Sequence, residues 1–177
     1  MPEEPINNRG SVSLNLASEQ LRIFIAWQMA AVDERYLVRA VTRPHVTLVM
    51  GVDSDIDIDA VRAAIRDQGA VSATTSEFAV FKDTHPGEDA IVMLLHSPEV
   101  AKMHDSLERA FGASRSQYAF RPHLTLAYVK SGSHDFLNGL NTESVALFFD
   151  EVRVRNDNAH DADTFPLNYE EDDDDDG

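Results

Sequence analysis

The chain has 177 residues, of which 43% are hydrophobic, and its formal net charge is −16 at pH 7; this size and composition suit one globular domain. It contains no cysteine, which excludes disulfide bonds and thiolate metal sites. The first residues lack the basic and apolar regions of a signal peptide, and the longest apolar stretch, around residues 23–31, is too short to span a bilayer, so we expect a cytoplasmic protein without membrane contact.

The chain is predicted to alternate strands and helices, because polarity alternates in some segments and follows helical spacing in others. In chain order we expect a flexible lead-in at residues 1–10, a strand at 11–16, a helix from an N-cap at Ser18 to about Glu34, a strand at 41–52 and a helix from about Asp57 to Gly69. The second half continues with strands at 76–81 and 90–95 joined by a turn at 83–88, a helix from Ser97 and Pro98 to Gly112, a strand at 119–130, a short helical piece near 134–140, and strands at 144–155 and 163–167. These elements predict an α+β domain, followed by an acidic disordered tail at 169–177.

A hexapeptide occurs twice: Arg-Pro-His-Val-Thr-Leu at 43–48 returns as Arg-Pro-His-Leu-Thr-Leu at 121–126. In a strand, neighbouring side chains point to opposite faces, so each histidine shares a face with its threonine while the apolar residues face a core. If two similar halves face each other, one imidazole can take a proton from an attacking hydroxyl while the other gives a proton to the leaving oxygen. The threonine hydroxyls can donate to the phosphoryl oxygens, and no metal is required. His45, Thr47, His123 and Thr125 are therefore the predicted catalytic residues.

On these residues the chain resembles the two-histidine (2H) phosphoesterase superfamily, which is named for two His-x-Thr/Ser motifs. The resemblance covers roughly residues 11–167, and the second motif, at 120–132, is especially similar to small bacterial and phage-encoded branches. It implies one bilobal α+β domain at 11–168, with two pseudo-symmetric lobes whose antiparallel sheets face a central cleft and with helices outside. Activities known in the superfamily include opening 2′,3′-cyclic phosphates, trimming RNA ends, 2′–5′ RNA ligation and, in phage anti-CBASS enzymes, destroying cyclic oligonucleotide signals in the host cytoplasm.

Several other side chains are candidates to bind a substrate. Arg43 and Arg121 lie two residues before the histidines and can bring guanidinium groups to a phosphate, although the intervening prolines make strand parity unreliable and a surface ion pair is the alternative. Simple alternation places Tyr128 on the face opposite His123, where it would pack in the core or stack against the lobe rather than take part in catalysis. Aromatic rings that can stack on a base, or simply fill the core, are Phe81, Tyr118 and Phe120.

The charge of the chain favours a small ligand. Seven acidic residues lie at 170–176, yet the remainder still holds nine more acidic than basic residues, which opposes binding to long nucleic acids. The other histidines share no spacing that would supply the three ligands of a catalytic zinc, so no metal and no other cofactor is expected. A monomer is expected.

The sequence thus predicts a metal-independent phosphodiesterase that cleaves a small, possibly cyclic, oligonucleotide. The alternatives are an RNA-end 2′,3′-cyclic phosphodiesterase or 2′–5′ RNA ligase-like enzyme, and a module that sequesters nucleotides without cleaving them. Because the two motifs are nearly identical, they do not show which histidine is the base and which is the acid.

Overall fold

An eight-stranded antiparallel sheet organises the computed structural model, which describes residues 10–52, 56–65, 69, 71–111, 120–156 and 162–167. The strands are β1 (Gly10–Leu16), β2 (Leu37–Ala40), β3 (His45–Val52), β4 (Val71–His85), β5 (Glu88–His96), β6 (His123–Lys130), β7 (Ala146–Arg155) and β8 (Asp163–Pro166). The helices are α1 (Leu21–Ala31), α2 (Ile58–Ile65) and α3 (Pro98–Phe111), with 3-10 turns at Ser18–Gln20, Glu34–Tyr36 and Asp135–Leu137. The acidic tail, most of the predicted lead-in and Tyr118 lie outside the described residues.

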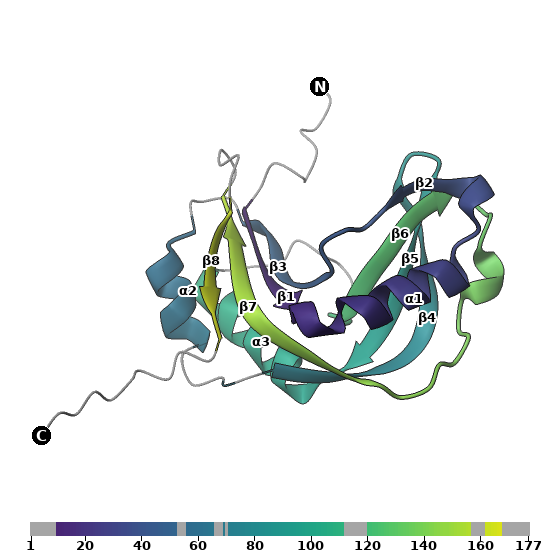
Figure 1. The fold of residues 1–177 in the computed structure, drawn as a ribbon. Coiled ribbons are helices and arrows are strands. Elements are labelled where there is room, and N and C mark those ends of the chain that lie inside the picture. The colour runs from purple at the N-terminus through teal and green to yellow at the C-terminus, as the bar shows by residue number, and fades with distance from the viewer. Residues whose placement is uncertain are drawn as a thin grey trace, which may run out of the picture.

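The strand order divides the sheet into two lobes. The order is β2-β6-β5-β4-β7-β1-β3, with β8 paired to β7. The long strand β4 joins the lobes, because its first residues pair with β7 and the rest of it pairs with β5. The sheet is strongly curved (Figure 1), and β3 and β6 make contact although four strands separate them in sheet order. The predicted α+β fold with facing antiparallel lobes is confirmed.

One face of the sheet packs against the helices and forms the core. The core residues of the motif strands are Val46 and Leu48 on β3 and Leu124 and Leu126 on β6, all at most 1% exposed. Phe24 of α1, Val61 of α2 and Val100, Met103 and Leu107 of α3 belong to the same buried cluster. Complete burial of such a side chain contributes about 1.5–3 kcal/mol. The opposite face of the sheet, here called the inner face, carries both motif histidines.

Some elements differ from the prediction. Helix α1 ends at Ala31, and Ser18 is not its N-cap, because the chain enters through a 3-10 turn preceded by Ala17 and no side-chain cap is present there. The helix stops short of Glu34 because Val32 is extended and Asp33 caps the next turn, accepting a hydrogen bond from the Arg35 N–H at 3.1 Å. Strand β2 follows where no strand was predicted, and β4 and β5 extend into the predicted turn as far as a pairing of His85 with Glu88.

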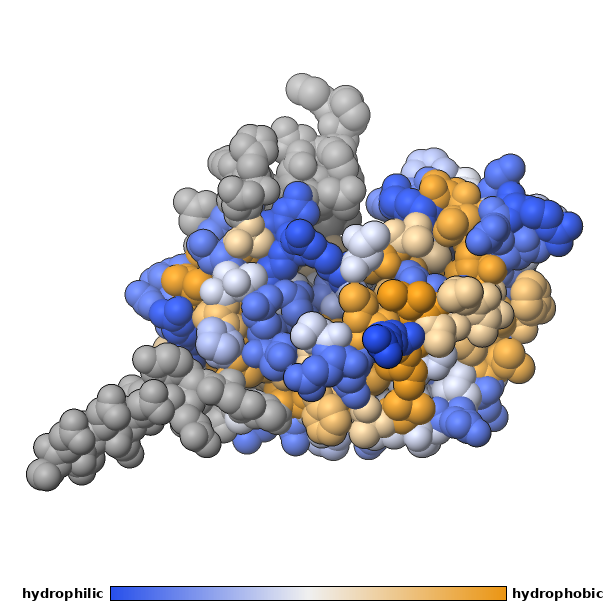
Figure 2. Space-filling view, in the orientation of Figure 1, coloured by the Kyte–Doolittle hydropathy of each residue, from blue (hydrophilic) through white to orange (hydrophobic). Residues whose placement is uncertain are grey.

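The predicted start of α3 is confirmed. The Ser97 hydroxyl accepts a hydrogen bond from the Val100 N–H at 3.1 Å, as an N-cap does. Of the described helices, none has both the length and the apolar character needed to cross a membrane. Figure 2 shows apolar surface over α1, where Leu21, Ile25 and Met29 recur at helical spacing and are exposed.

Candidate active site

The two His-x-Thr motifs occupy equivalent positions in the two lobes. Each motif strand pairs antiparallel with another strand of its own lobe: β3 with β1, and β6 with β5. His45 lies opposite Asn15, and His123 lies opposite Leu94. The residue before each histidine accepts a matching backbone bond, 3.1 Å at the Pro44 carbonyl and 2.9 Å at the Pro122 carbonyl. The sequence repeat is therefore also a structural repeat.

Both imidazoles are held in the same way. Nδ1 of His45 lies 2.9 Å from the Arg43 carbonyl oxygen, and Nδ1 of His123 lies 2.8 Å from the Arg121 carbonyl oxygen. Because a carbonyl can only accept, each Nδ1 carries a hydrogen and donates it. Each Nε2 is then left to act on a ligand, as a base when it is unprotonated and as an acid when it is protonated. Sequence reasoning assigned the arginines a side-chain role and missed this role of their carbonyls.

The two imidazoles lie within electrostatic range of each other. Burial lowers the pKa of His123, and the positive charges of His45 and Arg121 lower it further, which together outweigh the opposite effect of the hydrogen bond to the Arg121 carbonyl. The Phe81 ring meets the His123 ring edge to face, with centroids 4.8 Å apart. His123 is therefore biased toward the neutral form near pH 7.

The threonines share the inner face with the histidines. Thr47 lies opposite Ser13 of β1, and Thr125 lies opposite Val92 of β5. Both threonines are only partly buried, whereas the apolar residues that alternate with them belong to the core. Each hydroxyl is thus placed on the same side as its histidine, where it can donate to a bound phosphate.

The prediction that Tyr128 lies on the face opposite His123 is wrong. Thr125 pairs with Val92, and Ala127 pairs with the adjacent Ile91, so Leu126 is an extra residue in β6. Such a β-bulge reverses the alternation that follows it. Tyr128 pairs with Ala90, on the same face of β5 as Val92, and therefore lies on the inner face with Thr125.

The bulge is held by hydrogen bonds from outside its strand pair. The Leu126 carbonyl oxygen accepts from the Val41 N–H at 3.1 Å and from the Gln28 side-chain amide of α1 at 2.8 Å. Arg39 of β2 lies over the Tyr128 ring, 4.3 Å from its centroid. The bulge thus brings the Tyr128 ring to the inner face.

The predicted substrate-binding residues separate into two groups. Arg43 and Arg121 are exposed beside their histidines, and Phe81 is partly buried against His123. Phe120 packs against the core instead and stacks on His104, with ring centroids 3.9 Å apart and planes 3° from parallel. The structure brings Phe81 to the motif histidine but does not bring Phe120 there.

The inner faces of the two lobes differ in chemistry. In the second lobe, Phe81 and Tyr128 pack on a buried apolar cluster of Ala79, Ala90, Val92 and Leu94. In the first lobe the Asn15 amide donates to Glu151 Oε1 at 2.6 Å, and Glu151 and Arg153 of β7 lie opposite Asn15 and Ser13. A pocket of about 450 Å³ opens here, lined by Asn15, Leu16, Ala17, Ser18, Leu21, Thr42, Arg43, Pro44, Glu151, Arg153, Ala162 and Thr164.

The comparisons with known proteins agree with this architecture. Residues 14–154 match the model of the 2′-5′ RNA ligase superfamily. The chain belongs to this superfamily. A search of curated proteins gives no match. Escherichia coli LigT complexed with 3′-AMP is similar in structure, with 16% identity, a TM-score of 0.55 and coverage of 90% of this chain and 94% of LigT.

Two further solved structures are similar in fold to this chain. Kluyveromyces marxianus Usb1 has 17% identity and a TM-score of 0.62, and the match covers 91% of this chain and all of that one. The protein TT0787 of Thermus thermophilus has 12% identity and a TM-score of 0.60, with coverage of 90% of this chain and 94% of that one. At such identities the likeness shows the fold, while membership of a superfamily of phosphoesterases supports phosphoesterase activity in general.

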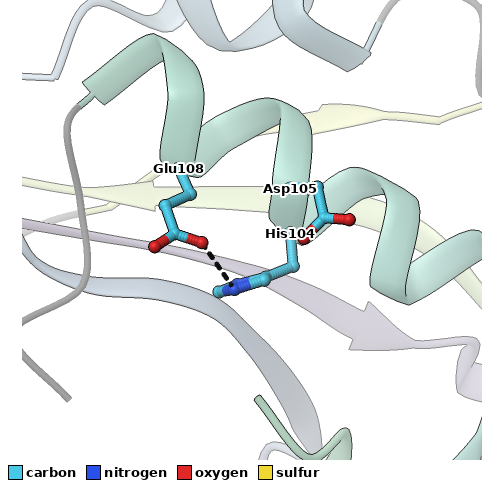
Figure 3. Close-up of side chains that lie close together, drawn as sticks. All are labelled: His104, Asp105 and Glu108. Atoms are coloured by element: carbon cyan, nitrogen blue, oxygen red, sulfur yellow. Dashed lines mark ion pairs between the residues drawn. The ribbon is translucent and has the colours of Figure 1, made fainter. Parts of the chain in front are cut away.

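A cluster of one histidine and two acidic residues lies apart from the superfamily's motif positions. His104, Asp105 and Glu108 of α3 have ligand atoms within 4.8 Å of one another (Figure 3). Nδ1 of His104 donates to the Leu48 carbonyl oxygen at 2.6 Å, and its Nε2 lies 3.1 Å from Glu108. Both ring nitrogens are therefore engaged within the protein. This histidine fastens α3 to β3.

Proposed function

We propose that this member of the superfamily is a metal-independent phosphodiesterase that cleaves a small oligonucleotide, with His45 and His123 as its acid and base. The observation that carries the proposal is the matched pair of imidazoles. Each has Nδ1 tied to the carbonyl two residues earlier, and the two rings lie close enough for the charge of one to affect the other. A binding protein does not need two titratable groups arranged in this way.

The environments of the histidines support different roles. His123, with its lowered pKa, suits the base, which leaves the acid to His45. In the proposed reaction Nε2 of His123 takes the proton of a ribose 2′-hydroxyl, whose oxygen attacks the neighbouring phosphorus. The bond from phosphorus to the 5′-oxygen breaks, and Nε2 of His45 gives that oxygen a proton. The products are a 2′,3′-cyclic phosphate and a free 5′-hydroxyl.

The remaining residues of the site stabilise and orient the substrate. The hydroxyls of Thr47 and Thr125 donate to the non-bridging oxygens as charge develops there. Phe81 offers a ring on which the base of the attacking nucleotide can stack, an interaction that contributes about 1–3 kcal/mol. Arg43 and Arg121 supply positive charge beside the phosphate. The LigT structures with 3′-AMP, ATP and NADP+ support a nucleotide as the substrate class.

The finer form of the proposal is a cyclic dinucleotide or trinucleotide signal, cleaved by a phage enzyme that counters host defence. Its support is the acidic surface and the resemblance of the second motif to phage-encoded members. The runner-up is an RNA-end 2′,3′-cyclic phosphodiesterase or ligase-like enzyme, in which the same base would activate water. A monomeric cytoplasmic protein is part of the proposal.

A panel of linear and cyclic oligonucleotides, incubated with the full chain in excess EDTA and analysed by mass, tests the proposal. We expect a 2′,3′-cyclic phosphate product from at least one ribonucleotide with a 3′–5′ linkage. His45→Ala and His123→Ala are each expected to lower turnover by about 10²-fold or more, the usual size of acid or base assistance. Either variant with near wild-type turnover would remove its histidine from the mechanism.

A further inference from the structure

The duplicated lobes have equivalent histidines and unlike surroundings. The residue opposite His123 is Leu94, whereas the residue opposite His45 is Asn15. Beyond His123, the inner face of the second lobe is apolar. Beyond His45, the inner face of the first lobe carries the charged side chains of Glu151 and Arg153. An apolar surface suits the flat face of a base, whereas fixed donors and acceptors suit its edge. The two lobes are therefore built for different parts of a substrate.

The pocket in the first lobe begins next to His45. Arg43 and Pro44, which directly precede this histidine, belong to its lining, as does Asn15, the cross-strand neighbour of His45. Its volume of about 450 Å³ lies in the range of small-ligand sites. In the mechanism proposed above, His45 gives its proton to the 5′-oxygen of the leaving nucleoside. The leaving nucleoside would consequently lie on the side of this pocket.

The polar groups in the pocket have a specific arrangement. The Asn15 amide holds the Glu151 carboxylate at 2.6 Å, and an ionised carboxylate only accepts hydrogen bonds. Arg153 lies two residues further along β7, about 6–7 Å away on the same face, and a guanidinium only donates. A ligand edge with two adjacent donors beside an acceptor would satisfy both groups.

Guanine has such an edge, since its N1–H and N2 amino group donate and its O6 accepts. Adenine turns an unprotonated N1 toward the same position, where it would face the carboxylate lone pairs. We propose that this pocket binds the leaving nucleoside and that Glu151 and Arg153 select guanine there. The inference rests on the proposed function for the position of the leaving nucleoside, but the guanine preference of the pocket itself does not depend on cleavage.

Two dinucleotides that differ only in the leaving base test the selection. We expect the wild-type chain to cleave ApG at least about tenfold more efficiently than ApA, since a well-placed bidentate contact discriminates between bases by about that factor or more. Glu151→Gln replaces one acceptor oxygen with an amide donor and should bring the two efficiencies to within about twofold. Arg155→Gln is the matched control, because Arg155 is an exposed arginine on the same strand outside the pocket lining. It should keep the preference for ApG.

Binding separates this inference from the proposed function. Titration calorimetry with 5′-GMP and 5′-AMP needs no turnover, and we expect tighter binding of 5′-GMP by the wild-type chain and loss of that preference in Glu151→Gln. Equal affinity of the wild-type chain for the two nucleotides, or an equal loss of affinity for both in Glu151→Gln, would overturn the guanine selection even if cleavage occurs. If no oligonucleotide of the panel is cleaved while the binding preference and its loss are observed, the pocket stands and the phosphodiesterase proposal fails.

Discussion

The assignment of His123 as base and His45 as acid predicts that their alanine variants respond differently to the leaving group. Each proton transfer should contribute about 10²–10⁴-fold, or roughly 3–5 kcal/mol of barrier. A 4-nitrophenolate departs without a proton, whereas the 5′-oxygen of a nucleoside requires one. His45→Ala should therefore lose about 10²-fold or more on ApA but less than about tenfold on adenosine 3′-(4-nitrophenyl phosphate). His123→Ala should lose about 10²-fold or more on both.

The structure explains why no neighbouring group should take over the proton transfer of a missing histidine. In each imidazole Nδ1 is occupied by a backbone carbonyl, so one nitrogen in each lobe is available for chemistry. Replacing one histidine leaves the other Nε2 on the opposite lobe, on the wrong side of an in-line reaction for the missing step. The remaining activity would come from the threonine hydroxyls and from substrate binding.

Initial rates on the two substrates, measured by absorbance for the nitrophenyl ester and by chromatography for ApA, give the test. Thermal unfolding followed by circular dichroism checks that both variants fold. His85→Ala is a suitable control, because His85 lies in the same sheet but pairs with Glu88, the first residue of β5, whereas His123 pairs with Leu94 six residues further along that strand. Equal losses of His45→Ala on both substrates, or a small loss of His123→Ala on the nitrophenyl ester, would refute the assignment.

Four further outcomes are expected. Activity should persist in excess EDTA, because the histidines carry the proton transfers; loss that a single divalent ion restores would contradict this. A 2′-deoxy analogue should bind but resist cleavage, and cleavage at an undiminished rate would identify water as the nucleophile. The kcat/KM profile should rise with pH through a pKa below 6.5, because neutral His123 is the active form and its pKa is lowered; a rise only above pH 7 would exclude it as the base. Asp89→Asn should lower the free energy of unfolding by about 2–4 kcal/mol at pH 7, because this buried carboxylate accepts from Lys82, Asp83 and Gly132. Burial alone would raise the pKa of Asp89, but these hydrogen bonds lower it, so the wild-type advantage in urea unfolding should be complete above about pH 4 and disappear at lower pH.

The motif strands were predictable because their signal is local. In each hexapeptide, polar and apolar residues alternate, and the structure places Val46 and Leu124 in the core with the histidines on the other face. Strand β2 has no such signal, since all four of its residues are exposed and only its pairing with β6 makes it a strand. A strand that depends on a partner about 90 residues away along the chain cannot be inferred from its own polarity.

The orientation of Tyr128 shows a second limit of local reasoning. Alternation is reliable only while the pairing register is unbroken, and the bulge at Leu126 breaks it. The groups that hold this bulge, Gln28 of α1 and Val41, are distant in sequence. The same limit explains why Asn15 and Glu151 were missed. Alternation in each strand could have placed both residues on the inner face. Only the order of the strands in the folded sheet, however, shows that β1 and β7 are neighbours.

Nearly identical hexapeptides can thus acquire different chemistry from their surroundings. His45 and His123 have the same local sequence, the same tautomer and equivalent cross-strand positions. What differs is the set of neighbouring side chains. Leu94 and Phe81 remove water from His123, whereas Asn15, which lies opposite His45, belongs to the lining of a polar pocket. Removal of water disfavours the charged form of an imidazole, which makes the second lobe the better place for a base. The acid and base roles therefore follow from residues outside both motifs. Exchanging the two hexapeptides should leave the base in the second lobe and the acid in the first.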